Sequence, residues 1–379
     1  MEKSVLAILS SVAFYGKERS NIEVYNLLND EDISLSIIIN KKADEQLKKY
    51  TSSFRTYQSN FPKRNRSRFR LLGFALDMLI SNISLLRILF KVKPHVLLMN
   101  SEIDFYNLYP VLLFFRRKIL YRVGDVPAVN GLSFRRYNAF VWKYYICKRV
   151  SVCVCISNYI KNLMIENGRI NQHDVVIYNY PPVRLESGPD ETWKYTNEKA
   201  TMKFAYLGQI TQSKGVGFLI EAALEIFKIN DDLLFYIAGS LEYDKEFSQK
   251  LQERIPDHYE NRIIFLREIT NISLFFENID VLIVPSLYEE ALGNVIVEAK
   301  QYAKPCIIFP TGGMPELITH QRDGFICDSR TIESLISGMK YYLDNPGIHI
   351  QHGCNAFKSI SLLGIDYNHF KKKWKEVFM

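Results

Sequence analysis

The stretch Tyr288-Glu289-Glu290-Ala291-Leu292-Gly293-Asn294-Val295-Ile296-Val297-Glu298-Ala299 decides the fold of this chain. Two carboxylates, Glu290 and Glu298, stand eight positions apart around Gly293. The apolar run from Val281 to Val284 ends in Pro285-Ser286 just before them. This order predicts a buried strand, then a loop that carries Glu290 and Gly293, and then a helix that carries Glu298.

A strand end that leads into a helix start is where open α/β sheets bind their ligands. The first backbone N–H groups of a helix have no partner within the helix, and they favour an anion. We therefore expect the N–H groups of Leu292, Gly293 and Asn294 to hold an anion at this position.

Two further segments accompany this stretch. Upstream, Phe204-Ala205-Tyr206-Leu207-Gly208-Gln209-Ile210 is followed by Ser213-Lys214-Gly215-Val216. Downstream, Lys304-Pro305 is followed by Gly312-Gly313-Met314-Pro315-Glu316-Leu317-Ile318. In order and spacing, the three segments resemble the donor-sugar region of the family 4 glycosyltransferases of the bacterial surface-polysaccharide type. The N-terminal half resembles that family only in outline.

The resemblance implies an α/β chain with the GT-B fold, in which two Rossmann-like domains turn their parallel sheets toward a central cleft. We expect an N-terminal domain over residues 1–184, facing the acceptor and a membrane, and a nucleotide-sugar-binding domain over 198–360. A helix within 365–379 would cross back to the first domain. Pro181-Pro182 and the stretch 186–190 indicate an interdomain linker near residues 181–198.

Periodicity supports two successive α/β units, because short apolar runs alternate with helical patterns. The strands predicted in the first unit are Val5–Leu9, Leu35–Ile39, Val96–Met99, Ile119–Val123, Val152–Ile156 and Val175–Ile177. Those in the second are Met202–Leu207, Leu233–Ala238, Ile263–Leu266, Val281–Val284 and Cys306–Phe309. Helices are expected at Asn21–Leu28, Ser157–Met164 and Tyr367–Phe378.

Size and charge agree with two domains and point to an anionic partner. A chain of 379 residues is too long for one ordinary core. The net charge of +7 hides an asymmetry, because residues 1–184 hold 28 Lys and Arg against 14 Asp and Glu, whereas the remainder holds 20 against 27. A strongly basic half indicates anionic lipid headgroups, a lipid diphosphate or nucleic acid.

The six cysteines show neither a C-x-x-C motif nor zinc-ligand spacing, which favours buried free thiols in a reducing compartment. The apolar run Val5 to Leu9 is too short for a signal peptide, so we expect a cytoplasmic protein.

In the donor region, Gly215 would let the backbone approach a phosphate and Lys214 would supply a point charge. The alternative for Lys214 is a solvated surface lysine. Gln209 stands where the family usually has Arg, so Lys214 is the main cation here, or another basic residue must assist it.

By resemblance, Glu298 accepts hydrogen bonds from the ribose hydroxyls, and Glu290 orients the donor sugar near the reacting carbon. Glu289 is the better candidate for an exposed loop carboxylate. The main chain near Ile269 would read the nucleobase.

The same resemblance implies a reaction that retains the anomeric configuration. Because Lys214 and the helix N-terminus would balance the negative charge of the diphosphate, no metal and no other cofactor is expected.

On the acceptor side, Gly16 opens a helix after the first strand and resembles the glycine that faces the donor phosphates and the acceptor. Asp125 follows another strand at the same sheet edge, where many family members carry a His-Asp pair. It could accept the proton of the incoming hydroxyl, or simply cap the next element. Arg122 could contact a phosphate or pair with Asp125.

Three patches of the first half combine basic residues with aromatic ones: 63–70, 112–118 and 134–137. We expect the basic residues of the first two to meet the membrane or the acceptor: Arg64, Arg66, Arg68, Arg70, Arg116 and Arg117. The stretch 71–90 predicts a surface helix with one apolar side, formed by Leu72, Ala75, Leu76, Leu79, Ile83 and Leu86. The alternative is a helix that merely covers the sheet. Nucleic acid is not expected, because no nucleic-acid-binding motif accompanies the charge.

Together these features predict a retaining hexosyltransferase at the inner face of the cell membrane. It would move a sugar from a nucleoside diphosphate to a lipid-linked saccharide in polysaccharide, lipopolysaccharide or glycolipid synthesis. The alternatives are a nucleotide-sugar epimerase or hydrolase on the same fold, and a non-catalytic protein that binds lipid or nucleic acid.

Overall fold

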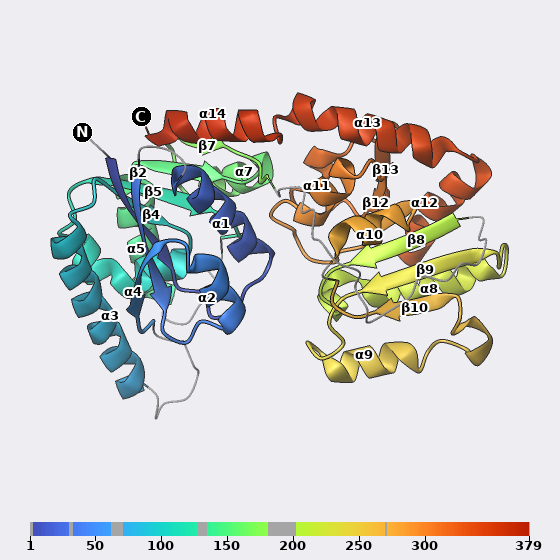
Figure 1. The fold of residues 1–379 in the computed structure, drawn as a ribbon, viewed down its shortest axis with the longest axis horizontal. Coiled ribbons are helices and arrows are strands. Elements are labelled where there is room, and N and C mark those ends of the chain that lie inside the picture. The colour runs from blue at the N-terminus through green and yellow to red at the C-terminus, as the bar shows by residue number, and fades with distance from the viewer. Residues whose placement is uncertain are drawn as a thin grey trace. The chain divides into compact units, whose positions relative to one another are not determined.

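The computed structural model describes residues 3–29, 33–61, 71–127, 135–180, 202–269 and 271–378, without the side chains of 71–74 and 135. The chain divides into two compact units (Figure 1). Unit 1 comprises Met1–Tyr180 with Phe370–Met379, and unit 2 comprises Pro181–His369. The linker predicted near 181–198 lies outside the described residues.

Unit 1 is built on a parallel sheet of seven strands in the order β3-β2-β1-β4-β5-β6-β7. The strands are β1 (Lys3–Leu9), β2 (Ile33–Asn40), β3 (Arg55–Ser59), β4 (Val96–Met99), β5 (Lys118–Val123), β6 (Val152–Cys155) and β7 (Val175–Val176). All but β3 were predicted. Its sequence, Arg55-Thr56-Tyr57-Gln58-Ser59, is polar because an edge strand is only partly covered.

Helices surround this sheet (Figure 1). They are α1 (Gly16–Asn29), α2 (Glu45–Thr51), α3 (Leu71–Val92), α4 (Glu102–Leu112), α5 (Arg135–Val141), α6 (Cys147–Arg149) and α7 (Asn158–Glu166), with a π-helical turn at Trp142–Ile146. The last helix of the chain, α14 (Tyr367–Phe378), completes the core of unit 1 with Phe370, Trp374, Val377 and Phe378. The ammonium groups of Lys3 and Lys118 donate to its last carbonyl oxygens, Phe378 O (2.9 Å) and Val377 O (2.6 Å).

Unit 2 has a parallel sheet of six strands in the order β10-β9-β8-β11-β12-β13. The strands are β8 (Met202–Leu207), β9 (Leu233–Ala238), β10 (Ile263–Leu266), β11 (Val281–Val284), β12 (Cys306–Ile308) and β13 (Gly324–Ile326). Only β13 was not predicted, since three residues are too few for a periodic signal. Both sheets confirm the predicted α/β class of two Rossmann-like domains.

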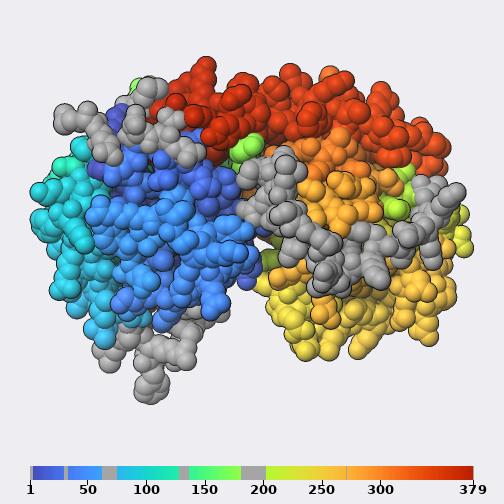
Figure 2. Space-filling model, in the orientation of Figure 1, coloured from blue at the N-terminus to red at the C-terminus, as the bar shows by residue number. Residues whose placement is uncertain are grey.

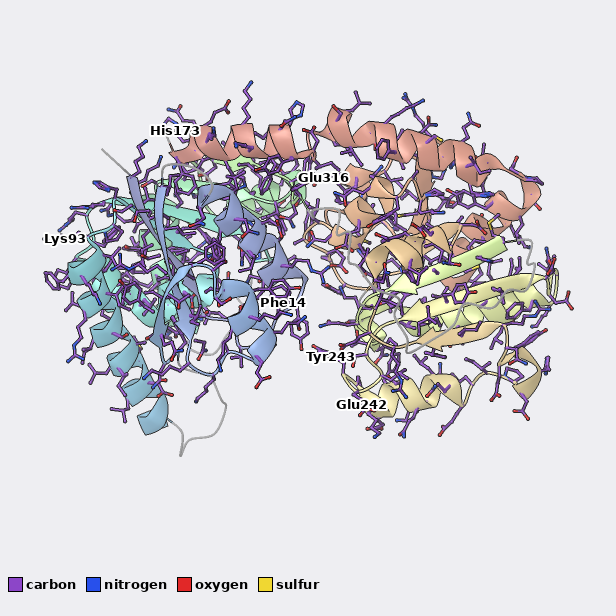
Figure 3. The ribbon with its side chains drawn as sticks, viewed as in Figure 1. Phe14, Lys93, His173, Glu242, Tyr243 and Glu316 are labelled. Carbon is purple, nitrogen blue, oxygen red and sulfur yellow. The ribbon has the colours of Figure 1, made fainter. Side chains whose placement is uncertain are left out.

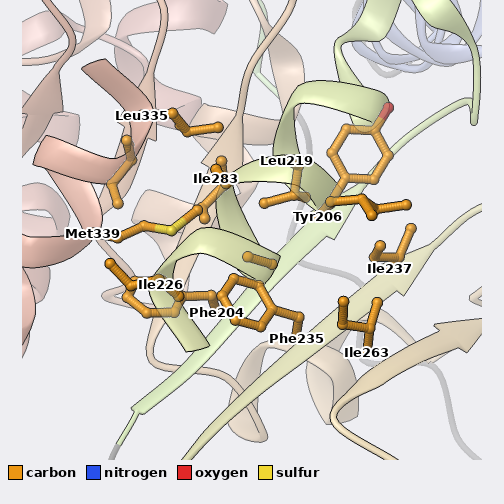
Figure 4. Packing of buried hydrophobic residues seen from close by; sticks show 14 of the residues in the cluster. Phe204, Tyr206, Leu219, Ile226, Phe235, Ile237, Ile263, Ile283, Leu335 and Met339 are labelled. Atoms are coloured by element: carbon orange, nitrogen blue, oxygen red, sulfur yellow. The ribbon is translucent and has the colours of Figure 1, made fainter. Parts of the chain in front are cut away.

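The helices of unit 2 are α8 (Val216–Phe227), α9 (Lys245–Gln252), α10 (Ile272–Glu277), α11 (Asn294–Gln301), α12 (Ile332–Asp344) and α13 (Ile348–Leu363), with short 3-10 turns at Gln212–Lys214, Asp257–Tyr259 and Met314–Leu317. Figure 4 shows how β8 and β9 pack against α8 and α12. Phe204 stacks on Phe235 with ring centroids 5.4 Å apart, and Leu335 and Met339 of α12 cover Ile283. This packing fixes the strands whose carboxyl ends carry the site.

The cysteines are free thiols, but they are not all buried. Cys153, Cys155, Cys306 and Cys327 are buried, Cys147 is half-buried and Cys354 is exposed. The prediction of buried thiols is therefore wrong for the last two, because Cys354 stands on the outer face of α13.

Candidate functional site

The site lies where two neighbouring strands of unit 2 end. Strands β8 and β11 are adjacent and parallel, so the loops that follow them meet at the same edge of the sheet. The N–H of Leu287 donates to the carbonyl oxygen of Ser213 at 2.9 Å and ties the loops together. Gly215 has a left-handed φ of 73°, and a Cβ there would lie 1.9 Å from the carbonyl oxygen of Pro285. Glycine is therefore required at this crossing for the contact with Pro285, whereas the sequence analysis expected it for the approach of a phosphate.

This crossing brings Lys214 against Glu290. The ammonium of Lys214 donates to Glu290 Oε1 at 2.8 Å, and the Glu290 side chain is only 12% exposed. The hydroxyl of Ser286 donates to the same oxygen at 2.6 Å, and the hydroxyl of Tyr288 donates to Glu290 Oε2 at 2.8 Å. Both oxygens of the carboxylate thus accept hydrogen bonds, and Lys214 is ion-paired, unlike the solvated surface lysine that was its alternative.

The neighbouring carboxylate, Glu289, turns the other way. Its Oε2 accepts the N–H of Gly312 at 2.6 Å, and its Oε1 is bound by the guanidinium of Arg330. Arg330 also donates to the carbonyl oxygen of Leu287 at 3.0 Å. Glu289 is half exposed, but it holds the loop after β12 in place. Adjacent carboxylates therefore have different partners, and Glu290 is the one that faces Lys214.

Helix α11 begins directly after this loop, with Gly293 as its N-cap at a φ of 92°. Leu292 is buried, whereas Asn294 and Glu298 are half-buried. The far end of the helix is anchored by a buried ion pair between Lys300 and Asp323, 2.9 Å apart. The helix that carries Glu298 is thus fixed at both ends.

Two other predicted donor residues lie on the same edge of the sheet. Gln209 is half-buried, and its carbonyl oxygen accepts the hydroxyl of Tyr206 at 2.7 Å. Burial, and then the nearby Glu290 and Tyr288, hold the pKa of Tyr206 well above its ordinary value, so this hydroxyl remains a neutral donor. Ile269 follows β10, which β9 separates from β8, so it belongs to a different part of the edge.

The predicted residues of unit 1 lie at the carboxyl edge of its own sheet. Gly16 is the first residue of α1, and Figure 3 labels Phe14 in the loop before it. The carboxylate of Glu18 fixes this loop by accepting the N–H of Tyr15 (3.2 Å) and the hydroxyl of Ser11 (2.5 Å), as in a capping box. Asp125 is 63% exposed and pairs with Lys17, a residue that the sequence analysis did not single out.

Arg122 takes neither of its two predicted roles. It is buried at 2% exposure, and its guanidinium donates to the side-chain oxygens of Ser20 (2.9 Å), Asn21 (2.6 Å) and Asn179 (2.5 Å). Burial lowers the pKa of Arg122 to about 10, and it still remains charged at neutral pH. The predicted pairing with Asp125 is wrong, because the guanidinium points into the unit and Lys17 takes that place.

Asp104 is a buried carboxyl that sequence reasoning missed. Burial raises its pKa to about 7, while the Ser10 hydroxyl and Lys17 act in the opposite direction. Ser10 is near enough to act on the pKa, yet neither oxygen of Asp104 has a partner at good hydrogen-bond geometry among the described residues. The sequence carries one signal for this residue, the spacing Ser101-x-x-Asp104, which is typical of the start of a helix such as α4.

Of the predicted membrane residues, Arg64, Arg66, Arg68 and Arg70 lie outside the described residues. Arg116 is exposed. Arg117 is exposed too, but its guanidinium donates to the carbonyl oxygens of Lys93 (2.7 Å) and Pro94 (3.0 Å) at the end of α3. It therefore fixes the loop after α4 against α3.

Known proteins resemble this chain in sequence and in fold. The family described as "Glycosyl transferases group 1" matches residues 189–358. An uncharacterized glycosyltransferase of Haemophilus influenzae is 25% identical over 174 residues, which are 45% of this chain and 47% of that protein. The match thus spans about half the length of that relative. The Escherichia coli UDP-Gal:alpha-D-GlcNAc-diphosphoundecaprenol alpha-1,3-galactosyltransferase is 23% identical over 299 residues, covering 73% of this chain and 76% of its own.

Solved structures extend the likeness to the whole chain. The Anabaena protein HepE in complex with UDP and glucose superposes with a TM-score of 0.77 at 17% identity, covering 99% of both chains. The galactosyltransferase WaaB of the lipopolysaccharide outer core superposes with a TM-score of 0.68 at 16% identity, also covering 99% of both. The fold is therefore that of two-domain GT-B proteins. Within its second unit, the chain matches the group 1 glycosyl transferases over residues 189–358, in the region where its motifs resemble that family.

Proposed function

We propose that this protein is a glycosyltransferase that moves a sugar from a nucleoside diphosphate to a saccharide acceptor. The observation that carries the proposal is the Lys214–Glu290 pair, held at 2.8 Å where the loops after β8 and β11 cross. Helix α11 starts at the same edge and adds the positive end of its dipole. A cation, a carboxylate and a helix N-terminus on one rigid edge suit a sugar diphosphate, which combines a dianionic leaving group with hydroxyls.

Each group has a task in the proposed reaction. Lys214 neutralises the charge that develops on the departing diphosphate, and the N-terminus of α11 assists it. Glu290 accepts hydrogen bonds from the donor sugar and supports its developing positive charge. Glu298 accepts hydrogen bonds from the ribose hydroxyls. Because fixed protein charges supply the electrostatics, we propose that the step needs no metal. By resemblance, the acceptor attacks the face that the diphosphate leaves, with retention of configuration.

We further propose a lipid-linked acceptor in surface-polysaccharide assembly. Two observations support it: the E. coli relative is named for a substrate linked to diphosphoundecaprenol, and the basic charge of this chain is concentrated in its first half. Such an acceptor resides in a membrane, so the protein must reach the bilayer surface from the inner face of the cell.

The surface proposed to meet the membrane is the outer side of α3. Its inner side packs on the unit through Ser81, Asn82, Leu85 and Ile88, and the amide of Asn82 donates to Asn107 O at 2.8 Å. The outer side is apolar as well, and we call these exposed residues the outer stripe of α3: Leu76, Leu79, Ile80, Ile83, Leu86 and Phe90. An exposed apolar stripe of this kind marks a surface that contacts a membrane or a partner.

Charge complementarity selects an anionic bilayer as the cover of the outer stripe. Exposed basic residues surround its C-terminal end: Arg87, Lys91, Lys93 and Arg116. Leu113 and Phe114 continue the apolar surface, with Phe114 79% exposed. Figure 2 shows α3 on the outer surface of unit 1, and Figure 3 labels Lys93 at its end. Apolar side chains rimmed by Lys and Arg suit an interfacial helix. Among the helices in the described ranges, none is long and apolar enough to span a membrane.

Donor binding is tested by a thermal-shift screen against UDP-, GDP-, ADP- and CMP-sugars. At least one is expected to stabilise the protein, and Glu298→Ala should abolish that shift. Glu225→Ala, an exposed carboxylate at the far end of α8, is the matched control and should leave it intact. Donor turnover without an acceptor would favour an epimerase or hydrolase. Absence of any shift would favour a non-catalytic protein.

Membrane binding is tested by co-sedimentation with phosphatidylglycerol–phosphatidylcholine vesicles. The double variant Leu79→Glu, Ile83→Glu is expected to stay in the supernatant. The matched control is Ile350→Glu, Phe357→Glu, which changes two exposed apolar side chains of α13 in unit 2 and should still bind. If the outer stripe instead joins two copies, the first variant will reduce the sedimentation coefficient of the protein in solution without affecting vesicle binding.

A further inference from the structure

Tyr288 is tied to both charged groups of the site. The residue is 41% exposed, in the loop between β11 and α11. Its hydroxyl accepts a hydrogen bond from Lys214 Nζ at 2.8 Å and donates one to Glu290 Oε2 at 2.8 Å. The same ammonium lies 4.8 Å from the centroid of the Tyr288 ring, within the range of a cation–π contact. Tyr288 therefore holds Lys214 through both its hydroxyl and its ring.

Lys214 needs such support because of what surrounds it. A lysine side chain is flexible and loses about 2 kcal/mol of rotamer entropy when it is fixed. Gln209 stands where the family that the chain resembles usually has Arg, so Lys214 is the one charged residue in the loop 208–215 after β8. An ammonium has three N–H donors. Within the described residues, Glu290 and Tyr288 take two of them, and one is left to meet a phosphate oxygen.

Glu290 needs Tyr288 for a second reason. When Lys214 turns toward a diphosphate, Glu290 loses its cation while remaining largely buried. An unpaired buried carboxylate is strongly unfavourable. The hydroxyls of Ser286 (2.6 Å) and Tyr288 (2.8 Å) still donate to its two oxygens, so the carboxylate stays satisfied while Lys214 moves.

We propose that Tyr288 is a positioning residue that aims Lys214 at the diphosphate of the donor and keeps Glu290 hydrogen-bonded during the transfer of the ammonium. It acts through Lys214 and not by its own contact with the reacting atoms. The inference rests on the proposed function, and it assigns to Tyr288 the support of the lysine that would bind the diphosphate.

The test compares UDP with uridine, which lacks the phosphates, in wild type, Tyr288→Phe and Tyr288→Ala. UDP affinity is measured by calorimetry and uridine binding by ligand-observed NMR. Tyr288→Phe keeps the ring and loses the hydroxyl, so UDP should bind about 3- to 10-fold more weakly. Tyr288→Ala loses both contacts and should weaken UDP further. Uridine affinity should not change in either variant.

Tyr302→Phe is the matched control, because it removes one tyrosine hydroxyl, bonded to Ser273 at 2.9 Å, beyond the opposite end of α11. It should alter neither affinity. Equal UDP affinity in wild type and Tyr288→Phe would overturn the positioning role, and so would parallel losses for UDP and uridine, which mean a general collapse of the loop. A wild-type protein that binds no nucleoside diphosphate would overturn the proposed function itself, and the inference with it.

Discussion

Replacing Gly215 by alanine is expected to separate the two loops that carry Lys214 and Glu290. The left-handed φ of 73° disfavours any side chain at this position. The added Cβ would lie 1.9 Å from Pro285 O and 2.8 Å from Pro285 C. Both are backbone atoms, so no rotamer change can relieve the contact. Ordinary contacts begin at roughly 3.5 Å, and the loops must therefore move apart by more than about 1 Å.

The magnitude follows from the contacts that this movement breaks. A non-glycine residue in the left-handed region costs about 1–3 kcal/mol. The bonds from Leu287 N to Ser213 O and from Lys214 to Glu290 cross the same gap, and a net hydrogen bond contributes about 1 kcal/mol. We expect the free energy of unfolding of unit 2 to fall by roughly 3–5 kcal/mol. A displaced Lys214 should also weaken nucleoside diphosphate binding by at least about 10-fold.

Gly347→Ala is a close control for this experiment. Gly347 has a φ of 83°, similar to that of Gly215, but a Cβ there would meet no atom within 4 Å. It should therefore show the conformational penalty alone, with normal nucleotide affinity. Urea denaturation gives the two stabilities, and calorimetry with UDP gives the two affinities. If both alanine variants lose the same stability and both retain full affinity, the crossing of the loops does not organise the site.

Three further results are expected. The pKa of Asp104 is raised to about 7 in the folded protein. The folded protein therefore keeps a proton that the unfolded chain releases above about pH 4. The contribution of this carboxyl to stability is lost as the pH rises through 7. A pKa unit corresponds to about 1.4 kcal/mol, so between pH 4 and 8 the free energy of unfolding of Asp104→Asn should rise by up to about 4 kcal/mol relative to that of wild type. A difference in stability that does not depend on pH, measured by urea denaturation, would contradict this. Lys300→Met should cost about 3–5 kcal/mol by leaving Asp323 buried without a cation, and an unchanged urea midpoint would refute it. Trp374→Ala should destabilise unit 1 by about 3–5 kcal/mol and leave UDP affinity, measured by calorimetry, unchanged.

The fold could be predicted from the sequence wherever strands are buried on both faces. Such strands read as continuous apolar runs, and Val96–Met99 and Val281–Val284 were predicted with their observed bounds. The two strands that were missed, β3 and β13, lie at the edges of their sheets, where half coverage and short length remove the apolar signal. Helix α14 was predicted from its amphipathic pattern, and its apolar side proved to be part of the core of unit 1.

The site could be predicted only as far as residue types and spacing reach. Spacing selected Glu290 over Glu289, and in the structure the two carboxylates have different partners, Lys214 and Arg330. Spacing could not reveal that Tyr288 bridges Lys214 and Glu290, since an aromatic residue in a loop has no pattern of its own. The pairing of Lys17 with Asp125 could not be predicted from spacing either. The two residues are 108 positions apart in the sequence, and the fold of the sheet brings them together.

Close approach of the backbone explains why this edge can hold a flexible lysine in place. Four loops follow the neighbouring strands β9, β8, β11 and β12, and each touches the next through a glycine. A Cβ on Gly239 would lie 2.0 Å from Gly208 O, one on Gly215 1.9 Å from Pro285 O, and one on Gly312 1.9 Å from Glu290 O. Each loop is thus fixed by its neighbour. Under the proposed function, the groups that would bind the donor are therefore already in position, and binding energy need not be used to assemble them.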